Sequence, residues 1–455
     1  MTTDFAQIDS YIAEHIQDWM EELRELCAIP SVSARHEGID ECAALVARML
    51  GRRGFGAEVS PTDGGHPIVL AHAAGTNRNR TLLFYNHYDV QPPEPLELWD
   101  SPPFQLTQRD GAVYARGSKD DKGEFVCRLA ALDAIRAVTG SYPCDITWLA
   151  EGEEESGSTH LPAWVEKNRA RLRADAAVWE EGGIEADETP IVRLGARGLL
   201  YVNLSVEAIA RDAHSGGANL LPNAAWRLVW ALATLKASDE RILIPGYYDA
   251  VRPPTPREEE LLNADNRSNL EVAAEMATAF GLKSLLGGIT DVDRAVFKPT
   301  ANLAGIGAGY QGEGSKTVIP ARAMAKMDFR LVPNQDPHDI ADKLRRHLDA
   351  GGFSDVQIEI LGAERAGITD PDAPVVKLNA EIAAEVYGKP PQIKPLTGGT
   401  TPMYLFTERG VPVVAPGVGW GSMNRAHSPN EFMRIKDFER AARHLARLAV
   451  RFADS

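Results

Sequence analysis

The chain has 455 residues, of which 44% are hydrophobic and 25% are charged, and its formal net charge is −16 at pH 7. This length exceeds one ordinary compact domain and predicts two, with a core large enough that folding needs neither disulfides nor metal. An acidic surface repels nucleic-acid phosphates and anionic lipid, so neither kind of partner is expected.

The N-terminal segment and the cysteines favour a cytoplasmic location. The opening MTTDFAQIDSYIAEH is polar and acidic and lacks the pattern of a signal peptide. No run of about 18 apolar residues predicts a membrane span. The four cysteines have no CxxC spacing, and scattered thiols are typical of a reducing compartment.

Apolar spacing predicts the elements of the outer segments. Residues 5–28 carry apolar side chains at helical spacing, and Pro30 follows where that helix should have ended. Short apolar runs that suit buried strands come next, at residues 81–85, 146–150, 176–179 and 411–415. Another helix is predicted at 375–387. This order predicts an α/β domain with a mostly parallel sheet flanked by helices.

The middle of the chain has a different pattern. Residues 199–207 and 322–332 read as strands, the first alternating as a half-buried strand does, and residues 223–236 read as a helix. We therefore expect an inserted α+β domain at 197–365. Residues 1–196 and 366–455 would form the discontinuous α/β domain around it.

Side chains that can bind metal follow the predicted strands. In an open α/β sheet, ligands gather beyond the carboxyl ends of the strands, so separate clusters there would form one site. Any one histidine or Glu-rich run is usually an ordinary surface feature, and the coincidence of the clusters carries the prediction. The candidates are His87 with Asp89, Asp120, Glu153 with Glu154 and Glu155, Glu180 with Glu181, and His427.

The chemistry of this set favours metal. Several carboxylates packed together repel one another, and some would stay protonated without a cation. Two imidazoles with several carboxylates suit zinc or a similar divalent ion. A pair of ions needs a shared carboxylate and a shared water, and a glutamate that is not a ligand could take the proton of that water.

These residues resemble a family of dinuclear-zinc metallopeptidases that includes carnosinase, glutamate carboxypeptidase, acetylornithine deacetylase and succinyl-diaminopimelate desuccinylase. The resemblance covers nearly the whole chain, and the length and the middle insertion are most similar to the carnosinase-type dipeptidase branch. The motifs that carry it are residues 29–33, 86–90, 116–123, 151–157, 212–216 and 426–431. The resemblance implies a catalytic domain, an inserted lid and dimerisation domain, and a homodimer.

The resemblance also implies a role for each candidate ligand. His87 and Glu181 would bind one zinc, Glu155 and His427 the other, and Asp120 would bridge both. The family ligand usually falls six residues after an aspartate like Asp175, which favours Glu181, with the neighbouring Glu180 as the alternative. Two ions per subunit are expected, zinc first, with Mn²⁺ or Co²⁺ as alternatives.

Two further residues of the motifs would act beside the ligands. Glu154 would be the general base, and Asp89 would orient His87. The Asp120–Asp121 peptide bond would be cis, as is frequent in this family.

The resemblance places substrate contacts in the inserted domain. His214 would reach across a dimer to the substrate carbonyl and stabilise an oxyanion. Thr317 and Arg330 would hold the substrate carboxylate, and a planar guanidinium suits that task. Asn302 and Thr400 are further candidates for the same pocket. Carnosinases carry another substrate-contacting histidine near the end of the lid, and residues 361–367 have none.

Together these features predict a metal-dependent hydrolase that cuts the peptide bond of dipeptides or small peptides with a free C-terminal carboxylate. An N-acyl-amino-acid deacylase is the alternative within the same chemistry. A metal-binding relative without activity is a third reading, against which the intact Glu154 and ligand set argue. The acidic composition disfavours a two-metal phosphoesterase.

Overall fold

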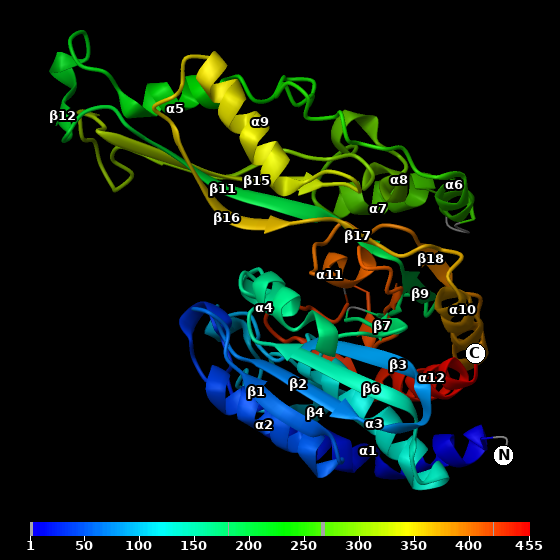
Figure 1. Ribbon diagram of the computed structural model, residues 1–455. Helices are drawn as coiled ribbons and strands as arrows, with labels where there is room; N and C mark the ends of the chain where they lie inside the picture. Colours follow the sequence, from blue (N-terminus) through cyan, green and yellow to red (C-terminus); the bar gives the residue numbers. More distant parts are fainter. Residues whose placement is uncertain (1–2, 181, 265–268, 422) are drawn as a thin grey trace. The chain divides into compact units, whose positions relative to one another are not determined.

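The computed structural model of the protein describes residues 3–180, 182–264, 269–421 and 423–455 (Figure 1). The chain folds into two compact units. The first comprises Met1–Leu194, Ile368–Pro395 and Leu405–Ser455, and the second comprises Gly195–Gly367 and Leu396–Tyr404. The chain therefore leaves the first unit and returns to it, and the second unit also takes the short segment that carries Thr400.

The first unit is built on a mixed sheet with the strand order β1-β2-β6-β3-β7-β19. Strands β1, β2 and β6 are antiparallel neighbours, whereas β6, β3, β7 and β19 run parallel. Their bounds are β1 (Gly56–Ser60), β2 (Ile68–Ala73), β3 (Gly75–His87), β6 (Tyr142–Glu151), β7 (Ala176–Val178) and β19 (Val413–Val414). The parallel strands bring their carboxyl ends to one edge of the sheet.

Helices α1, α2, α3 and α12 pack together on one face of this sheet (Figure 1). Helix α1 begins where the Asp4 side chain accepts hydrogen bonds from two backbone N–H groups, and its buried stripe includes Ile8, Ile12 and Ile16. The helices of the first unit are α1 (Phe5–Cys27), α2 (Ile39–Arg52), α3 (Lys122–Thr139), α4 (Leu161–Lys167), α10 (Pro374–Tyr387), α11 (Tyr404–Thr407) and α12 (Ile435–Asp454).

Two smaller sheets complete the first unit. One has the order β18-β9-β8-β20, and the other has the order β21-β5-β4. Their bounds are β18 (Gln392–Lys394), β9 (Pro190–Arg193), β8 (Gly183–Ile184), β20 (Gly419–Trp420), β21 (Phe432–Arg434), β5 (Ala112–Tyr114) and β4 (Thr107–Arg109). The loop after β5 carries Asp120, and the loop between β20 and β21 carries His427.

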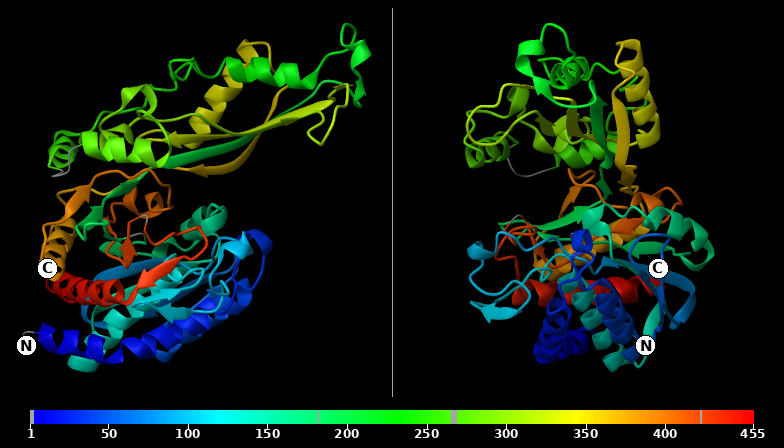
Figure 2. Two further views of the ribbon diagram at one scale, coloured as in Figure 1. Left: turned by 180° about the vertical axis from the view of Figure 1, so that it is seen from behind. Right: turned by 90° about the vertical axis from the view of Figure 1, so that its left-hand side faces the viewer.

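The second unit is an antiparallel sheet covered on one face by α5 and α9 (Figure 2). Its order is β13-β15-β11-β16, and its core lies between the sheet and these helices. The strands are β13 (Asn302–Ala308), β15 (Arg322–Leu331), β11 (Gly198–Glu207) and β16 (Gln357–Glu364), with two short pairs, β12 (Ala213–His214) with β14 (Val318–Ile319) and β10 (Gly195–Ala196) with β17 (Gly367–Ile368). The helices are α5 (Ala224–Ala233), α6 (Pro256–Asn263), α7 (Asn269–Ala279), α8 (Val292–Ala295) and α9 (Pro337–Ala350).

The predicted fold class is confirmed. The helix predicted at 5–28 is α1, and the apolar runs lie in β3, β6, β7 and β19. The strands at 199–207 and 322–332 are β11 and β15, and the helices at 223–236 and 375–387 are α5 and α10. Only the last apolar run is much shorter as a strand than predicted, because β19 is the edge strand of the sheet and pairs only with the short strand β7.

Candidate metal centre

His87 is the last residue of β3, and Asp89 holds its ring. The Nδ1 atom of His87 lies 3.1 Å from the backbone oxygen and 3.5 Å from the Oδ1 atom of Asp89. Both side chains are buried. Because Nδ1 faces Asp89, the Nε2 atom of His87 points at the other acidic residues of the cluster.

The Asp89 carboxylate also holds the turn after β6. It accepts hydrogen bonds from the backbone N–H groups of Glu154, at 3.3 Å, and of Glu155, at 3.1 Å. Asp89 therefore orients an imidazole and two glutamates at once. The sequence predicts the first of these tasks but not the second.

The loop that carries Asp120 is fixed by a buried carboxylate, that of Glu431. One oxygen of Glu431 accepts from the backbone N–H groups of Lys119 and Asp120, both at 3.0 Å. The other accepts from the Arg116 guanidinium at 2.8 Å and from the Gly117 N–H at 3.1 Å. The Asp120–Asp121 peptide bond is cis, as the resemblance predicts.

Asp120 lies between two pairs, each made of an imidazole and a glutamate. Its Oδ1 atom is 3.1 Å from His87 Nε2, and its Oδ2 atom is 3.2 Å from His427 Nε2. His87 Nε2 is also 3.6 Å from Glu180 Oε2, and His427 Nε2 is 3.1 Å from Glu155 Oε2. One carboxylate between two ligand sets is the arrangement that a pair of divalent ions requires.

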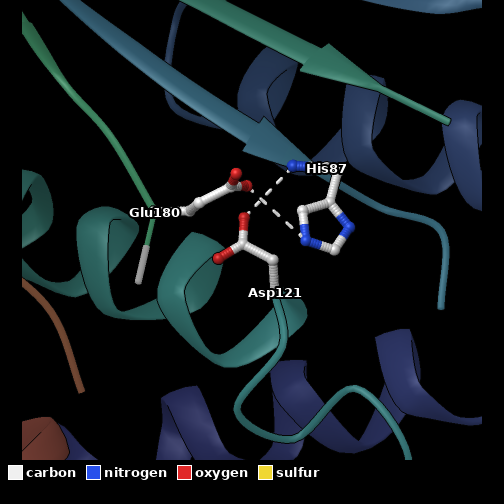
Figure 3. Close-up of side chains that lie close together, drawn as sticks. All are labelled: His87, Asp121 and Glu180. Carbon is white, nitrogen blue, oxygen red and sulfur yellow. Dashed lines mark hydrogen bonds and ion pairs between the residues drawn. The ribbon is translucent and has the colours of Figure 1, made fainter. Parts of the chain in front are cut away.

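Of the two glutamates considered as the ligand beside His87, the structure describes only Glu180. Glu180, the alternative in the sequence analysis, points at His87 (Figure 3). Glu181 lies outside the described residues. Asp121, to which the sequence analysis assigned no role, completes a cluster with His87 and Glu180 in which the potential ligand atoms lie within 4.8 Å of one another.

Asp121 is held in a way that leaves one oxygen available. Its Oδ2 atom accepts from the Asn86 side chain at 2.6 Å and from the His87 N–H at 3.1 Å. Its Oδ1 atom is buried and has no hydrogen-bond partner among the described residues. A buried carboxylate oxygen without a donor fits a site that takes a cation.

The electrostatics of the cluster point the same way. Burial, followed by the charge of Glu180, raises the pKa of Glu154 well above its usual range. Burial also raises the pKa of Glu155. Hydrogen bonds to Asp120 and Glu155 raise the pKa of His427 to about 10. Without a cation, burial and like charges thus favour the protonated forms of Glu154 and Glu155, and the imidazole and carboxylate donors fit zinc or a similar ion.

In the second unit, Arg330 and Thr400 are brought together. Arg330 Nη1 donates to Thr400 Oγ1 at 2.6 Å. Arg197, which no motif marks in the sequence, donates to the Gly398 carbonyl at 3.2 and 3.3 Å. Burial and then the charge of Arg330 lower the pKa of Arg197 to about 10. Two guanidiniums that repel each other fit a site for an anion.

His214 and Thr317 lie at the other end of β15. The backbone N–H of Ser215, next to His214, donates to the Thr317 carbonyl at 3.2 Å, and His214 Nδ1 accepts from the Gly216 N–H at 3.0 Å. The neutral ring therefore carries its proton on Nε2. Arg322 and Arg330 mark the two ends of β15, which are roughly 26 Å apart at the usual rise of a strand. Within one chain, His214 is thus remote from Arg330.

Asn302 is the first residue of β13 and pairs with Asp328 of β15. Its side chain donates to Asp328 Oδ2 at 2.7 Å, across the pairing of β13 with β15. Asp328 precedes Arg330 by two residues on the same strand, so both point to the same face of the sheet.

Residues 83–451 match the family described as Peptidase family M20/M25/M40. The chain belongs to this peptidase family. The human Beta-Ala-His dipeptidase is 30% identical over 364 residues, which cover 75% of this chain and 71% of that protein. The Cys-Gly metallodipeptidase DUG1 of Candida albicans is 28% identical over 92% of this chain and 91% of its own.

Among solved structures, the M20 family metallo-carboxypeptidase Sso-CP2 from Sulfolobus solfataricus has a TM-score of 0.90 at 38% identity, covering 96% of this chain and 99% of that chain. The predicted family and the predicted enzyme class, a peptidase, are therefore confirmed. Within residues 3–180, 182–264, 269–421 and 423–455, no helix has the length and apolar character needed to cross a bilayer.

Proposed function

We propose that this M20 peptidase hydrolyses the peptide bond of dipeptides with a free C-terminal carboxylate, using two divalent ions, of which zinc is the first candidate. The observation that supports the proposal most directly is the Asp120 carboxylate, which faces His87 with one oxygen and His427 with the other. The names of the human and Candida relatives, Beta-Ala-His and Cys-Gly dipeptidases, support dipeptides as the substrate class.

The ligand set would be His87, Glu180, Asp120, Glu155 and His427, with Asp120 shared. Ions bound there would supply Lewis acidity and lower the pKa of a water between them. Glu154 would take a proton from this water on its carboxylate and return it to the leaving amine. A raised pKa suits this task, because the same group must accept and then donate a proton near neutral pH.

The substrate would be held by groups of the second unit. Arg330, with Thr400 and the neighbouring Arg197, would bind the C-terminal carboxylate. His214, with its proton on Nε2, would donate to the carbonyl oxygen as negative charge develops there. Thr317 and Asn302 would add hydrogen bonds to the bound peptide.

A homodimer follows from the same proposal. Because His214 and Thr317 lie at the opposite end of β15 from Arg330, each chain would contribute one group to its own site and the other to the site of a second copy. Helix α5 also offers an apolar surface, with Trp226 and Trp230 stacked and 58% and 55% exposed. Substituting both tryptophans by aspartate should convert a sedimenting dimer into a monomer, and an unchanged dimer would contradict this interface.

The cytoplasmic location remains a proposal, as does the lack of nucleic-acid and membrane partners. All four cysteines are buried and free, which suits a reducing compartment. Fractionation of the source cells, with the enzyme followed by immunoblot, would test the location. Recovery in a membrane or nucleic-acid fraction would contradict these expectations.

A substrate screen tests the activity itself. The chain is loaded with Zn²⁺, Mn²⁺ or Co²⁺ and offered β-Ala-His, Cys-Gly and matched N-acetyl amino acids. The dipeptides should be cleaved faster than the matched N-acetyl amino acids. Faster cleavage of the N-acetyl compounds would favour a deacylase, and absence of any cleavage with both ions bound would indicate a non-catalytic relative.

A further inference from the structure

A small pocket opens beside the candidate metal centre, entirely within the first unit. Its volume is about 270 Å³, close to the lower end of the usual range for ligand sites, so it suits one side chain better than a whole peptide. Asp120 and His427 line one side of it. Whatever occupies this pocket is therefore next to the reacting bond.

Four glycines, Gly182, Gly183, Gly419 and Gly421, are among the residues that line the pocket. Gly183 on β8 pairs with Gly419 on β20. A Cβ atom on Gly183 would lie 2.1 Å from the backbone oxygen of Gly419, and one on Gly182 would lie 1.9 Å from that of Ala415. Backbone cannot give way as a flexible side chain can, so only glycine allows these segments to approach so closely, and no side chain of residues 182, 183 or 419 occupies the pocket.

Two cations face this space, although the protein as a whole is acidic. Lys119 precedes Asp120, and its Cε atom lies 3.7 Å from the place of a Cβ on Gly419. Arg193 is the last residue of β9 and also lines the pocket. Both side chains also interact with other groups of the protein, and both line the pocket, where their charge acts on whatever binds there. Apart from the metal-centre residue Asp120, no carboxylate is found among the described lining residues.

We infer that this pocket binds a carboxylate carried on the acyl side of the scissile amide, and that Lys119 and Arg193 select for it. The inference rests on the proposed function, which assigns the C-terminal carboxylate to Arg330 of the second unit and so leaves the acyl side for this pocket. A guanidinium and an ammonium in the lining of a small pocket form charge-assisted hydrogen bonds with a glutamyl side chain but not with the isosteric glutaminyl side chain.

The test compares Glu-Ala, Gln-Ala and Lys-Ala as substrates of the metal-loaded enzyme. Wild type should prefer Glu-Ala to Gln-Ala by about tenfold or more in kcat/KM, the effect of one hydrogen-bonded charge pair. Arg193→Met should bring this ratio several-fold closer to one, because only Lys119 remains, and Arg193→Glu should lower it further. Each ratio is internal to one preparation, so partial loss of folded enzyme does not alter it.

One further variant serves as a control, and another can replace Arg193→Met. Arg171→Met removes another arginine of the same unit, one that pairs with Glu58 on the surface, and should keep the wild-type ratio. Lys119→Met provides the same test as Arg193→Met if that variant fails to fold.

The outcomes separate this inference from the proposed function. A wild-type ratio near one, with rapid cleavage of all three dipeptides, overturns the inference alone. An Arg193→Met variant whose KM rises equally for Glu-Ala and Gln-Ala would assign the pocket to the C-terminal carboxylate and also overturn it. If no dipeptide is cleaved, both proposals fail.

A final pair of substrates identifies the source of the carboxylate. N-succinyl-Ala and N-butyryl-Ala differ by an acyl carboxylate without an amino group. Preference for N-succinyl-Ala over Glu-Ala, lost in Arg193→Met, assigns the pocket to dicarboxylic acyl groups. Preference for Glu-Ala assigns it to N-terminal acidic residues.

Discussion

Replacing Glu431 with glutamine should damage the metal centre without touching a ligand. The carboxylate is fully buried and accepts four hydrogen bonds, two on each oxygen. An amide keeps the shape but turns one oxygen into an NH₂ group, which meets two donors and can accept from neither. Loss of two hydrogen bonds to a charged group should cost about 3–6 kcal/mol. The buried Arg116 would also lose its counter-charge, which places the effect towards the upper end.

Denaturant unfolding and metal titration together measure this effect. The free energy of unfolding of the first unit should fall by the amount above. Affinity for both ions should fall with it, because the loop that carries the shared ligand Asp120 is released. Glu166→Gln, which removes an exposed partner of Arg409, is the matched control and should change stability by less than about 1 kcal/mol. If Glu431→Gln is as stable as this control, the positioning role assigned to Glu431 is refuted.

Three further predictions concern the cluster itself. Glu154→Gln should lower kcat by about 10²–10⁴-fold with both ions still bound, as measured by turnover and metal analysis, and near-normal turnover would reject Glu154 as the base. Asp89→Asn should weaken metal affinity by about 10–100-fold in a competition titration with a chelator, and unchanged affinity would reject its orienting role. In the metal-free protein, the raised pKa of His427 means that its ion pairs stabilise fully below pH 6.5 and are lost as the pH rises to about 10. The Tm should therefore fall across this window, and His427→Gln should remove that part of the fall; an identical profile in the variant would contradict it.

Much of the candidate site could be predicted because the candidate ligands follow strands. Apolar runs identify buried strands in a single sequence, and the residues just beyond them must lie at one edge of a parallel sheet. His87, Glu155 and His427 were found in this way. The same logic cannot choose between Glu180 and Glu181. Neighbouring side chains in an extended chain point to opposite sides, and an apolar run alone does not tell which side faces the site.

What could not be predicted depends on contacts between distant parts of the chain. Glu431 binds backbone N–H groups about three hundred residues earlier, and backbone donors leave no trace in the sequence. Asp121 lies within the motif at 116–123, but its hydrogen bonds with the Asn86 side chain and the His87 N–H exist only in the folded chain. Arg197 gains meaning only because folding places it beside Arg330. Thr400 belongs with the second unit although the surrounding sequence returns to the first.

Diffraction from crystals grown with zinc, recorded at the zinc absorption edge, tests the central claim most directly. Two anomalous peaks about 3.5–4 Å apart are expected, with the Asp120 carboxylate bonded to both. A single peak, or two peaks that do not share Asp120, would contradict the account.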